Sequence, residues 1–382
     1  MDIYRKQETV YKFINAIHNE LRKEGNPQNN YKIIQITGTN GKGSTSSMIY
    51  SCLLEAGYKA GLYTKPPLVT DLEKIRVGKR FISEREFKSY YDITAGYIRA
   101  LKYFSETGCE YAVIENEVGG LSDYTNNLNP YMSIITNVDY DHQKILGNTL
   151  EEIARDKCGV YKPCVKYPIV GDLPESCMVI ADNTCERSGI TPIHAMEYEG
   201  NVYKSGFLGA FQEKNEKIAC CAAHYLGIED KYIEAGLKNV LENSGLRGRW
   251  ETICEQPKVI VDVGHNMNAW EYHIKFLNEE AEAGKKVGLV FGMMKDRPIR
   301  EIFSRLDKRV VVYICRVRNT PLPPVEVTAE IAKECGLGYK TFPDGPNEAL
   351  EVAKTDGCDT ILCSGGFFIC GDLLKNYPAS II

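Results

Sequence analysis

A glycine-rich turn between an apolar run and a helical pattern constrains this chain more than any other feature of its sequence. Residues 33–36 form a β-branched run typical of a buried strand, and apolar residues at helical spacing follow Lys42. Glycines let main-chain N–H groups point at a ligand, and the start of a helix offers unpaired amides. Strand, turn and helix together predict a phosphate-binding loop. The alternative is a glycine-rich turn with a solvated lysine.

Within this loop, the lysine would add a mobile positive charge, and a hydroxyl from Ser44 or Thr45 would face a phosphate-bound Mg²⁺. The spacing departs from that of the commonest nucleotide-binding loop, because only two residues separate Gly38 from Gly41. The loop residues that we expect to bind the nucleotide are Gly38, Thr39, Asn40, Gly41, Lys42, Gly43, Ser44 and Thr45.

The composition excludes several classes of protein. A net charge of -5 without a basic stripe argues against a nucleic-acid partner. No apolar run approaches the ~20 residues that a membrane span needs, and the N-terminus has no apolar signal core. The 14 cysteines include no Cys-x-x-Cys pair, which is typical of buried thiols in a reducing compartment. We therefore expect a cytoplasmic protein with no membrane partner.

The order of apolar runs predicts two α/β domains. Runs at 111–114 and 132–136 are typical of strands buried on both faces of a parallel sheet. Between about 158 and 203 we expect a smaller mixed sheet, and near 245–249 a glycine and arginine linker. Four further strand-like runs follow at 259–261, 287–291, 309–314 and 360–363. The fold class is thus α/β, with an N-terminal P-loop-type domain and mostly parallel sheet (1–245) and a C-terminal Rossmann-like domain (246–382).

Several separated segments resemble one family, the folylpolyglutamate and dihydrofolate synthases of the Mur ligase superfamily. The resemblance runs in the same order and similar spacing over most of the chain. It is carried by residues 38–44, 61–64, 73–77, 123–126, 136–137, 141–142, 156–159, 248–249, 262–266 and 291–296. It implies an ATP-binding central domain followed by a ligase domain.

The chemistry of such a ligase explains these motifs. A carboxylate becomes electrophilic when the γ-phosphoryl group of ATP is transferred to it, and an amine then attacks the acyl phosphate. This reaction needs a phosphate-binding loop, Mg²⁺ and cations that stabilise the tetrahedral intermediate. The resemblance implies metal ligation by Ser44, Glu115 and His142. The triplet Glu117-Val118-Gly119 makes Glu117 a competitor of Glu115, and the alternative for His142 is an ordinary loop histidine.

The resemblance assigns roles to five further residues. Lys157 would be carbamylated by CO₂ and help hold a second Mg²⁺, whereas the alternative is a surface lysine paired with Asp156. Asn215 resembles the adenine-contacting residue and Arg249 the linker arginine that touches the ATP phosphates. Asp262 resembles the ribose partner, and His265 the histidine that faces the reacting groups. The catalytic set implied is therefore Lys42, Lys157 and His265.

Three segments depart from the family pattern. Lys65 stands where the family has a metal-binding serine, and a protonated lysine cannot ligate Mg²⁺. Gly366 replaces the serine associated with the incoming glutamate, and Leu121 replaces an arginine. Our hypothesis is that Lys65 places its ammonium where a metal-bound charge would otherwise lie, and that the enzyme acts on an altered acceptor. The alternative is a solvated lysine.

The sequence as a whole predicts a monomeric, ATP- and Mg²⁺-dependent ligase. Its substrates would be ATP, L-glutamate and a folate or dihydropteroate, and domain closure around ATP would accompany the reaction. Two alternatives remain, namely a Mur-superfamily ligase for a different carboxylate and amine, and a catalytically weakened ATP-binding regulatory protein.

Overall fold

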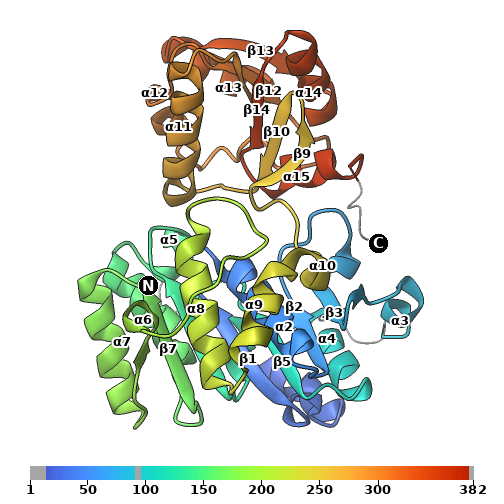
Figure 1. Cartoon of the computed structure of the whole chain (residues 1–382), viewed down its shortest axis with the longest axis vertical. Helices are drawn as coiled ribbons and strands as arrows, with labels where there is room; N and C mark the ends of the chain where they lie inside the picture. The colour runs from blue at the N-terminus through green and yellow to red at the C-terminus, as the bar shows by residue number, and fades with distance from the viewer. Residues whose placement is uncertain (1–13, 91–95, 378–382) are drawn as a thin grey trace. The chain divides into compact units, whose positions relative to one another are not determined.

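The computed structural model describes residues 14–90 and 96–377, which form two compact units (Figure 1). Of the described residues, the first unit comprises 14–66, 72–90, 96–206 and 211–246, and the second comprises 67–71, 207–210 and 247–377. The main division therefore falls within the predicted linker, whereas two short segments from the N-terminal part of the sequence belong to the second unit.

The first unit is built on an eight-stranded sheet with the order β4-β3-β2-β5-β1-β6-β7-β8. The six strands from β2 to β8 in this order are parallel, and β3 and β4 run antiparallel at one edge. The strands are β1 (Lys32–Thr37), β2 (Ala60–Tyr63), β3 (Ile75–Val77), β4 (Arg80–Phe81), β5 (Tyr111–Glu115), β6 (Met132–Asn137), β7 (Tyr167–Asp172) and β8 (Ile193–His194).

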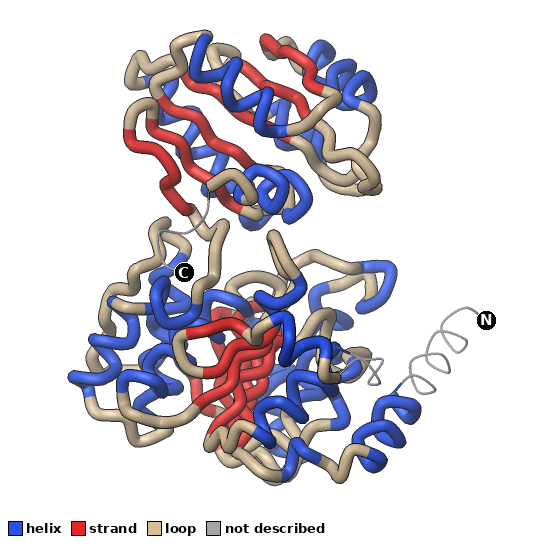
Figure 2. The backbone as a smooth tube through the Cα atoms, turned by 90° about the vertical axis from the view of Figure 1, so that its right-hand side faces the viewer, coloured by secondary structure: helices blue, strands red, loops and turns tan. Residues whose placement is uncertain are grey.

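Helices cover both faces of this sheet (Figure 2). Ile33, Ala112 and Ile114 pack with α4, and the alternate residues Ile34 and Val113 are also fully buried. Because α2 contacts β1, β2 and β5 and also packs against α8, α9 and α10, it is buried along most of its length. The helices are α2 (Lys42–Glu55), α3 (Glu84–Lys88), α4 (Gly96–Glu106), α5 (Gln143–Leu146), α6 (Leu150–Lys157), α7 (Glu175–Arg187), α8 (Gln212–Tyr225), α9 (Asp230–Lys238) and α10 (Val240–Ser244).

The second unit has a six-stranded sheet with the order β13-β12-β11-β14-β10-β9, in which only β9 is antiparallel. Alternate strand residues enter two separate cores. Ile260 and Leu289 pack with α11, α12 and α13, whereas Val261 and Val290 pack with α14 and α15. The strands are β9 (Glu251–Glu255), β10 (Lys258–Asp262), β11 (Val287–Phe291), β12 (Val311–Cys315), β13 (Gly338–Phe342) and β14 (Thr360–Ser364). The helices are α11 (Met267–Glu282), α12 (Ile299–Ser304), α13 (Val325–Glu334), α14 (Pro346–Thr355) and α15 (Phe367–Leu374).

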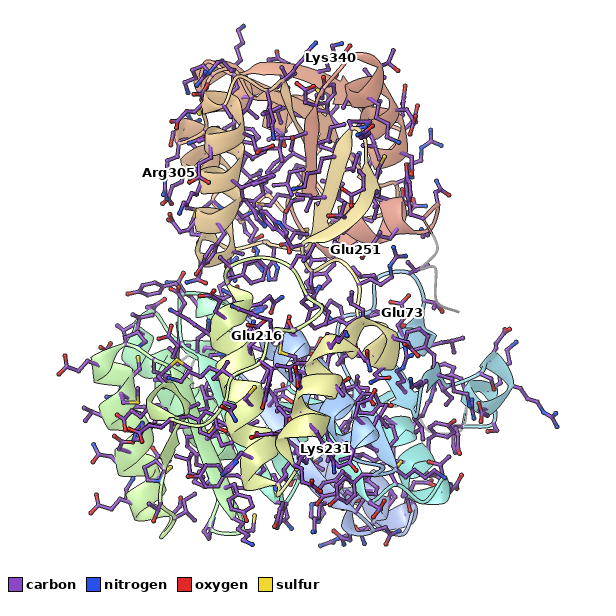
Figure 3. The ribbon with its side chains drawn as sticks, viewed as in Figure 1. Glu73, Glu216, Lys231, Glu251, Arg305 and Lys340 are labelled. Atoms are coloured by element: carbon purple, nitrogen blue, oxygen red, sulfur yellow. The ribbon has the colours of Figure 1, made fainter. Side chains whose placement is uncertain are left out.

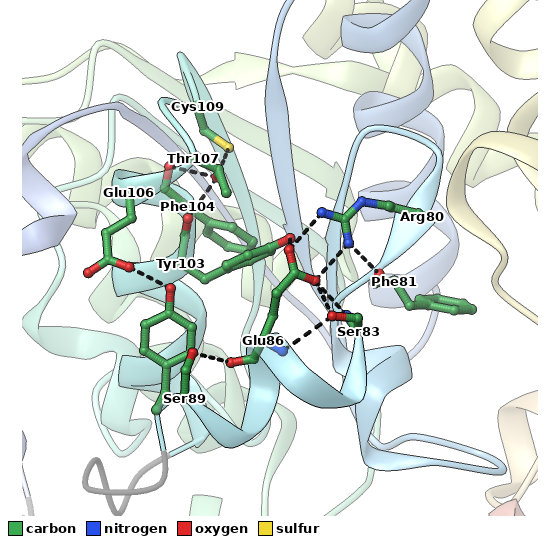
Figure 4. Close-up of polar contacts among 11 residues, drawn as sticks. Arg80, Phe81, Ser83, Glu86, Ser89, Tyr103, Phe104, Glu106, Thr107 and Cys109 are labelled. Atoms are coloured by element: carbon green, nitrogen blue, oxygen red, sulfur yellow. Dashed lines mark hydrogen bonds and ion pairs between the residues drawn. The ribbon is translucent and has the colours of Figure 1, made fainter.

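A capping network fixes the start of α3 (Figure 4). The Ser83 hydroxyl accepts the Glu86 main-chain N–H at 3.2 Å, and the Glu86 carboxylate accepts the Ser83 N–H at 2.8 Å. Arg80 donates to both oxygens of Glu86, at 2.7 and 2.8 Å, and the Tyr103 hydroxyl donates at 3.1 Å. The hydrogen bonds from Arg80 hold the pKa of Glu86 well below its usual range. This network ties β4 and α3 to α4.

The structure confirms the α/β class, although it differs from the predicted elements in two places. Residues 158–203 do not form a separate mixed sheet, because β7 and β8 extend the parallel sheet of the first unit. In the second unit β9 and β13 were missed, since β13 is largely exposed and lacks an apolar run. None of the helices in the described ranges is long and apolar enough to cross a membrane.

Candidate nucleotide and ligase site

The predicted phosphate-binding loop joins the carboxyl end of β1 to the first turn of α2. Gly41 is the N-cap of α2 in the left-handed region (φ 78°), and no side chain caps this helix. The first N–H groups of a helix have no partner within it. Together with the dipole of the 14-residue helix, these amides favour an anion at this end.

Two glycines of the loop are required by their surroundings. At Gly38 (φ +151°), an added Cβ would lie 1.8 Å from the Thr136 hydroxyl oxygen. At Gly41 (φ +78°), it would lie 2.2 Å from the Asn215 side-chain oxygen. Both positions therefore need the absence of a side chain, because Thr136 and Asn215 occupy the space that a Cβ would fill.

Residues at the end of β6 hold the loop in place. The Asn137 side-chain oxygen accepts the main-chain N–H groups of Thr39 at 3.0 Å and Asn40 at 2.9 Å. The Thr136 hydroxyl donates to the Asn40 carbonyl at 2.6 Å. The loop geometry is therefore set by the neighbouring parallel strand as well as by its own glycines.

Lys42 lies over this loop. Its ammonium donates to the main-chain carbonyls of Gly38 at 3.0 Å and Thr39 at 3.1 Å. The charge is thus held on the carbonyl groups of the loop that precedes α2.

The start of α8 lies against the same loop. Asn215 donates to the Gln212 side-chain oxygen at 2.8 Å, and Gln212 donates to the Ser44 hydroxyl at 3.4 Å. Asn215 and Ser44, which are 171 positions apart in the chain, are therefore brought together at the loop. Thr45 differs, because its hydroxyl is buried without a hydrogen-bond partner among the described residues.

The two competing glutamates lie in different environments. Glu115 ends β5 opposite Ile36 of β1, is 4% exposed, and accepts the Lys65 main-chain N–H at 3.1 Å. Glu117 is half-exposed and pairs with the Lys65 ammonium at 2.5 Å. The Lys65 ammonium also lies 3.2 Å from the Tyr124 hydroxyl and is therefore not simply solvated. This arrangement favours Glu115, at the carboxyl edge of the sheet, as the metal ligand.

His142 follows β6 and begins α5 in the left-handed region (φ 50°). Its side chain is partly exposed, with one ring nitrogen 3.8 Å from the Asp141 carboxylate. Among the described residues, no group of three or more His, Cys, Asp or Glu side chains is placed to hold a metal ion. Ser44, Glu115, His142 and Lys157 therefore remain predicted metal ligands.

Lys157 is 3% exposed at the end of α6, which excludes the surface lysine considered above. Burial, together with the nearby charge of Lys42, lowers the pKa of its ammonium to about 7. The neighbouring Asp156 carboxylate accepts the Gly120 N–H at 2.8 Å and a hydrogen bond from Ser122. Burial thus favours the neutral amine of Lys157, the form that carbamylation by CO₂ would require.

In the second unit, Arg249 and His265 flank one aromatic ring. The Arg249 guanidinium lies 5.7 Å from the centre of Phe367, and the His265 ring lies 5.4 Å from it. His265 Nδ1 lies 3.1 Å from the Val263 carbonyl. Phe367 follows Ser364-Gly365-Gly366, one of the divergent segments, and sequence reasoning gave it no role.

Asp262 ends β10 and is almost fully buried. Its carboxylate accepts the main-chain N–H groups of Trp250 at 2.9 Å and Gly264 at 2.8 Å. His273 lies 2.9 Å from the same carboxylate, a contact that the sequence did not indicate. Asp262 thus has three protein partners already, and a ribose hydroxyl would have to use its remaining acceptor capacity.

Two family models match the chain in the places where these sites lie. The Mur ligase middle domain matches residues 36–171, and the Mur ligase glutamate ligase domain matches residues 248–367. A dihydrofolate synthase/folylpolyglutamate synthase of Bacillus subtilis is 24% identical over 401 residues, covering 93% of each chain. The protein of the same name in Escherichia coli is 28% identical and covers 91% of this chain and 87% of its own.

The chain belongs to the folylpolyglutamate and dihydrofolate synthase family of Mur ligases. It is accordingly an ATP-dependent acid–amino-acid ligase. Solved structures agree with this family in fold. Folylpolyglutamate synthase of Mycobacterium tuberculosis, complexed with ADP and AMPPCP, is 20% identical with a TM-score of 0.82, covering 97% of this chain and 96% of its own. The bifunctional synthase of Yersinia pestis, with AMPPNP and Mn, is 24% identical with a TM-score of 0.79, covering 96% and 92%.

Proposed function

We propose that this ligase adds L-glutamate to the carboxylate of a folate or dihydropteroate through an acyl phosphate, using MgATP. The observation that carries the proposal is the loop at the start of α2, where the close packing of Gly38 and Gly41 fixes the backbone, no side chain caps the helix and Lys42 lies across the loop. The family relatives are named for these two activities, which supports the choice of acceptor.

The first unit binds the nucleotide and metal in this proposal. Residues 38–45 hold the phosphates, with Asn215 beside the loop at the start of α8. The Mur-ligase relatives solved with ADP or AMPPNP and Mn support binding of a nucleotide and a divalent ion. Mg²⁺ would be held by Ser44, Glu115 and His142, with carbamylated Lys157 at a second ion. When bound, the metal supplies positive charge that lowers the barrier to phosphoryl transfer.

The second unit supplies Arg249, Asp262 and His265. Arg249 contributes charge to the ATP phosphates, and Asp262 accepts from the ribose. His265 assists the reacting carboxylate and amine through its ring nitrogens, which can donate or accept a hydrogen bond.

The reaction balances in two steps. An acceptor carboxylate oxygen attacks the γ-phosphorus, the bond to the β,γ-bridging oxygen breaks, and ADP leaves. The glutamate amine then attacks the carbonyl carbon of the acyl phosphate, loses a proton, and expels inorganic phosphate. Lys42 moves from the Gly38 and Thr39 carbonyls to the transferred phosphoryl group, where its charge stabilises the negative charge of the transition state.

A direct assay tests this function. ADP formation is measured with purified protein, MgATP and L-glutamate, and either dihydropteroate or tetrahydrofolate is added separately. We expect ADP only when both glutamate and one of the pteridine acceptors are present. If other amino acids or carboxylates alone support ADP formation, the acceptor assignment is wrong.

One observation favours a second candidate, a ligase of this family for another carboxylate and amine. Lys65, Leu121 and Gly366 all differ from the family pattern, and Lys65 pairs with Glu117 through its ammonium and with Glu115 through its main-chain N–H. A screen of carboxylates and amino acids distinguishes this candidate. A regulatory protein would instead bind ATP and release no phosphate with any acceptor.

We also propose that the protein is a cytoplasmic monomer. All 14 cysteines are free, and most are buried, which suits a reducing compartment. Analytical ultracentrifugation at micromolar concentration tests the oligomeric state.

A further inference from the structure

His273 belongs to a buried polar chain in the second unit. One ring nitrogen, Nε2, lies 2.9 Å from Asp262 Oδ1, and the other, Nδ1, lies 3.4 Å from the Ser364 hydroxyl. His273 is 1% exposed and Ser364 is fully buried. Because a carboxylate only accepts hydrogen bonds, Nε2 carries the proton and the imidazole donates to Asp262.

Through Asp262, this series of buried hydrogen bonds reaches the segment that carries Arg249. Asp262 Oδ2 accepts the Trp250 main-chain N–H at 2.9 Å, and Trp250 is the residue directly after Arg249. Trp250 has a positive φ of 53°, a conformation that a bulky side chain rarely adopts. Such a conformation persists only where the surroundings hold it, and the carboxylate of Asp262 is one of the groups that do so.

The same segment is held at a second point. Glu251, labelled in Figure 3, accepts the Gly248 main-chain N–H at 2.8 Å and the Arg247 Nε–H at 2.9 Å. The Gly248 carbonyl in turn accepts the Val263 N–H at 3.1 Å. The backbone on both sides of Arg249 is therefore fixed to the second unit by carboxylates.

A buried carboxylate needs its hydrogen bonds, because an unsatisfied charge in the interior is costly. Burial raises the pKa of Asp262, but the hydrogen bond from His273 and the nearby charges outweigh burial and hold it below its ordinary value. The two tryptophans of the chain enclose the imidazole, with ring centres 5.4 Å away for Trp250 and 4.8 Å for Trp270. The imidazole thus has little freedom to leave Asp262.

We infer that His273 is a positioning residue of the ligase, which acts through Asp262 and the Trp250 amide to fix Arg249. This inference rests on the proposed role of Arg249 at the ATP phosphates. It assigns to Asp262 a structural task in addition to the proposed ribose contact. Without the imidazole, Asp262 loses a donor, its hold on the Trp250 amide weakens, and Arg249 is no longer presented in one geometry.

A double-mutant cycle between His273 and Arg249 tests this inference. We expect His273→Leu to lower kcat/KM for MgATP on the order of 10- to 100-fold, the range seen when a supporting group is lost. In an Arg249→Ala background the same substitution should cost less than about 2-fold, because coupled residues are not additive. Equal losses in both backgrounds would overturn the inference.

Three variants separate positioning from stability. His273→Gln keeps an N–H donor and should recover most of the activity, whereas His273→Met, of similar size without a donor, should not. Ile274 is the next residue on α11 and belongs to the same core, so Ile274→Ala serves as a control for lost packing. If Ile274→Ala lowers kcat/KM as much as His273→Met at matched stability, the role is merely structural. His273→Met also replaces His273→Leu in the cycle if the leucine variant does not fold.

Binding measurements keep this test distinct from the proposed function. The Kd of MgAMPPNP is measured by calorimetry for the same variants, with tryptophan fluorescence as the reporter of the His273 surroundings. If the wild type shows no acceptor-dependent ADP formation, the proposed function fails. In that case the Kd of MgAMPPNP alone tests the inference. The inference fails if the His273 and Arg249 substitutions change this Kd independently of each other.

Discussion

The Lys42 ammonium lies 3.0 Å from the main-chain carbonyl oxygen of Gly38, so the positive charge at the start of α2 is hydrogen-bonded to the backbone of its own loop. A bound phosphate offers a stronger partner than a neutral carbonyl. We therefore predict that Lys42→Met lowers kcat/KM for MgATP roughly 100- to 1,000-fold, the usual cost of losing one group that stabilises transition-state charge. Steady-state ADP release measures it, with Lys231→Met on the surface of α9 as the control (Figure 3). A wild-type rate in Lys42→Met would contradict this role.

Gly41 and Gly57 allow the cost of backbone strain to be separated from the cost of a clash. Both have positive φ, 78° and 85°, but an added Cβ meets Asn215 at Gly41 and nothing within 4 Å at Gly57. Gly57→Ala should lower the free energy of unfolding by about 1–2 kcal/mol through backbone strain alone. Gly41→Ala should lower it further, because Asn215 must also shift. Only Gly41→Ala should also weaken ATP binding, which calorimetry measures. Equal ATP affinity in the two variants would argue against the loop as the phosphate site.

Lys157 should take up CO₂ in a pH-dependent manner. Its amine has a pKa of about 7, so the neutral, nucleophilic form increases as the pH rises from 6 to 8. With ¹³C-labelled bicarbonate, we expect a carbamate ¹³C-NMR signal that grows over this range and is absent from Lys157→Arg, since arginine stays protonated. A signal that is unchanged in Lys157→Arg would show modification elsewhere.

The Lys65 side chain is predicted to influence the Mg²⁺ concentration that the ligase requires. Its ammonium pairs with Glu117, and its main-chain N–H binds Glu115. If the ammonium takes the place of a metal-bound charge, Lys65→Ser should raise the Mg²⁺ concentration for half-maximal ADP release. The increase should be only several-fold, because an exposed ion pair contributes at most about 1 kcal/mol. Lys65→Arg keeps the charge and should behave as the wild type. Unchanged Mg²⁺ dependence and rate in Lys65→Ser would remove the idea.

The Glu86 network predicts a pH-dependent stability. Because the pKa of Glu86 is lowered in the folded state, its contribution is complete above the unfolded value of about 4.3 and is lost as the pH falls through the folded value. Glu86→Gln should lower the free energy of unfolding by about 1 kcal/mol at pH 7, as for loss of a helix cap. Urea titrations should show that the two proteins converge in acid. A difference that persists at the lowest pH would contradict the assignment.

The sequence predicted those features that depend on local pattern. Residues 33–45 carry both the strand and the loop geometry in their own glycines and β-branched side chains, and the strand runs at 111–114 and 132–136 lie at β5 and β6. The alternation of strands and helices was sufficient for the α/β class. The roles assigned to Arg249, Asp262 and His265 came from family resemblance and remain predictions.

Contacts between distant segments could not be predicted. The lowered pKa of Lys157 depends on its burial and on the charge of Lys42, which lies 115 positions away in the chain. The hydrogen bond of His273 to Asp262 joins a helix to a strand end, and no spacing rule marks it. Residues 67–71 and 207–210 join the second unit, although the surrounding sequence belongs to the first. Such features follow from tertiary packing, which local pattern does not encode.

The central claim is that the γ-phosphoryl group of ATP passes to the acceptor carboxylate before the amide forms. Transfer of ¹⁸O from a carboxylate-labelled acceptor to inorganic phosphate tests it most directly, because the bridging oxygen of an acyl phosphate leaves with the phosphate. With labelled dihydropteroate or folate, L-glutamate and MgATP, we predict one ¹⁸O in each phosphate released. Phosphate that forms without ¹⁸O, while the amide product accumulates, would contradict the account.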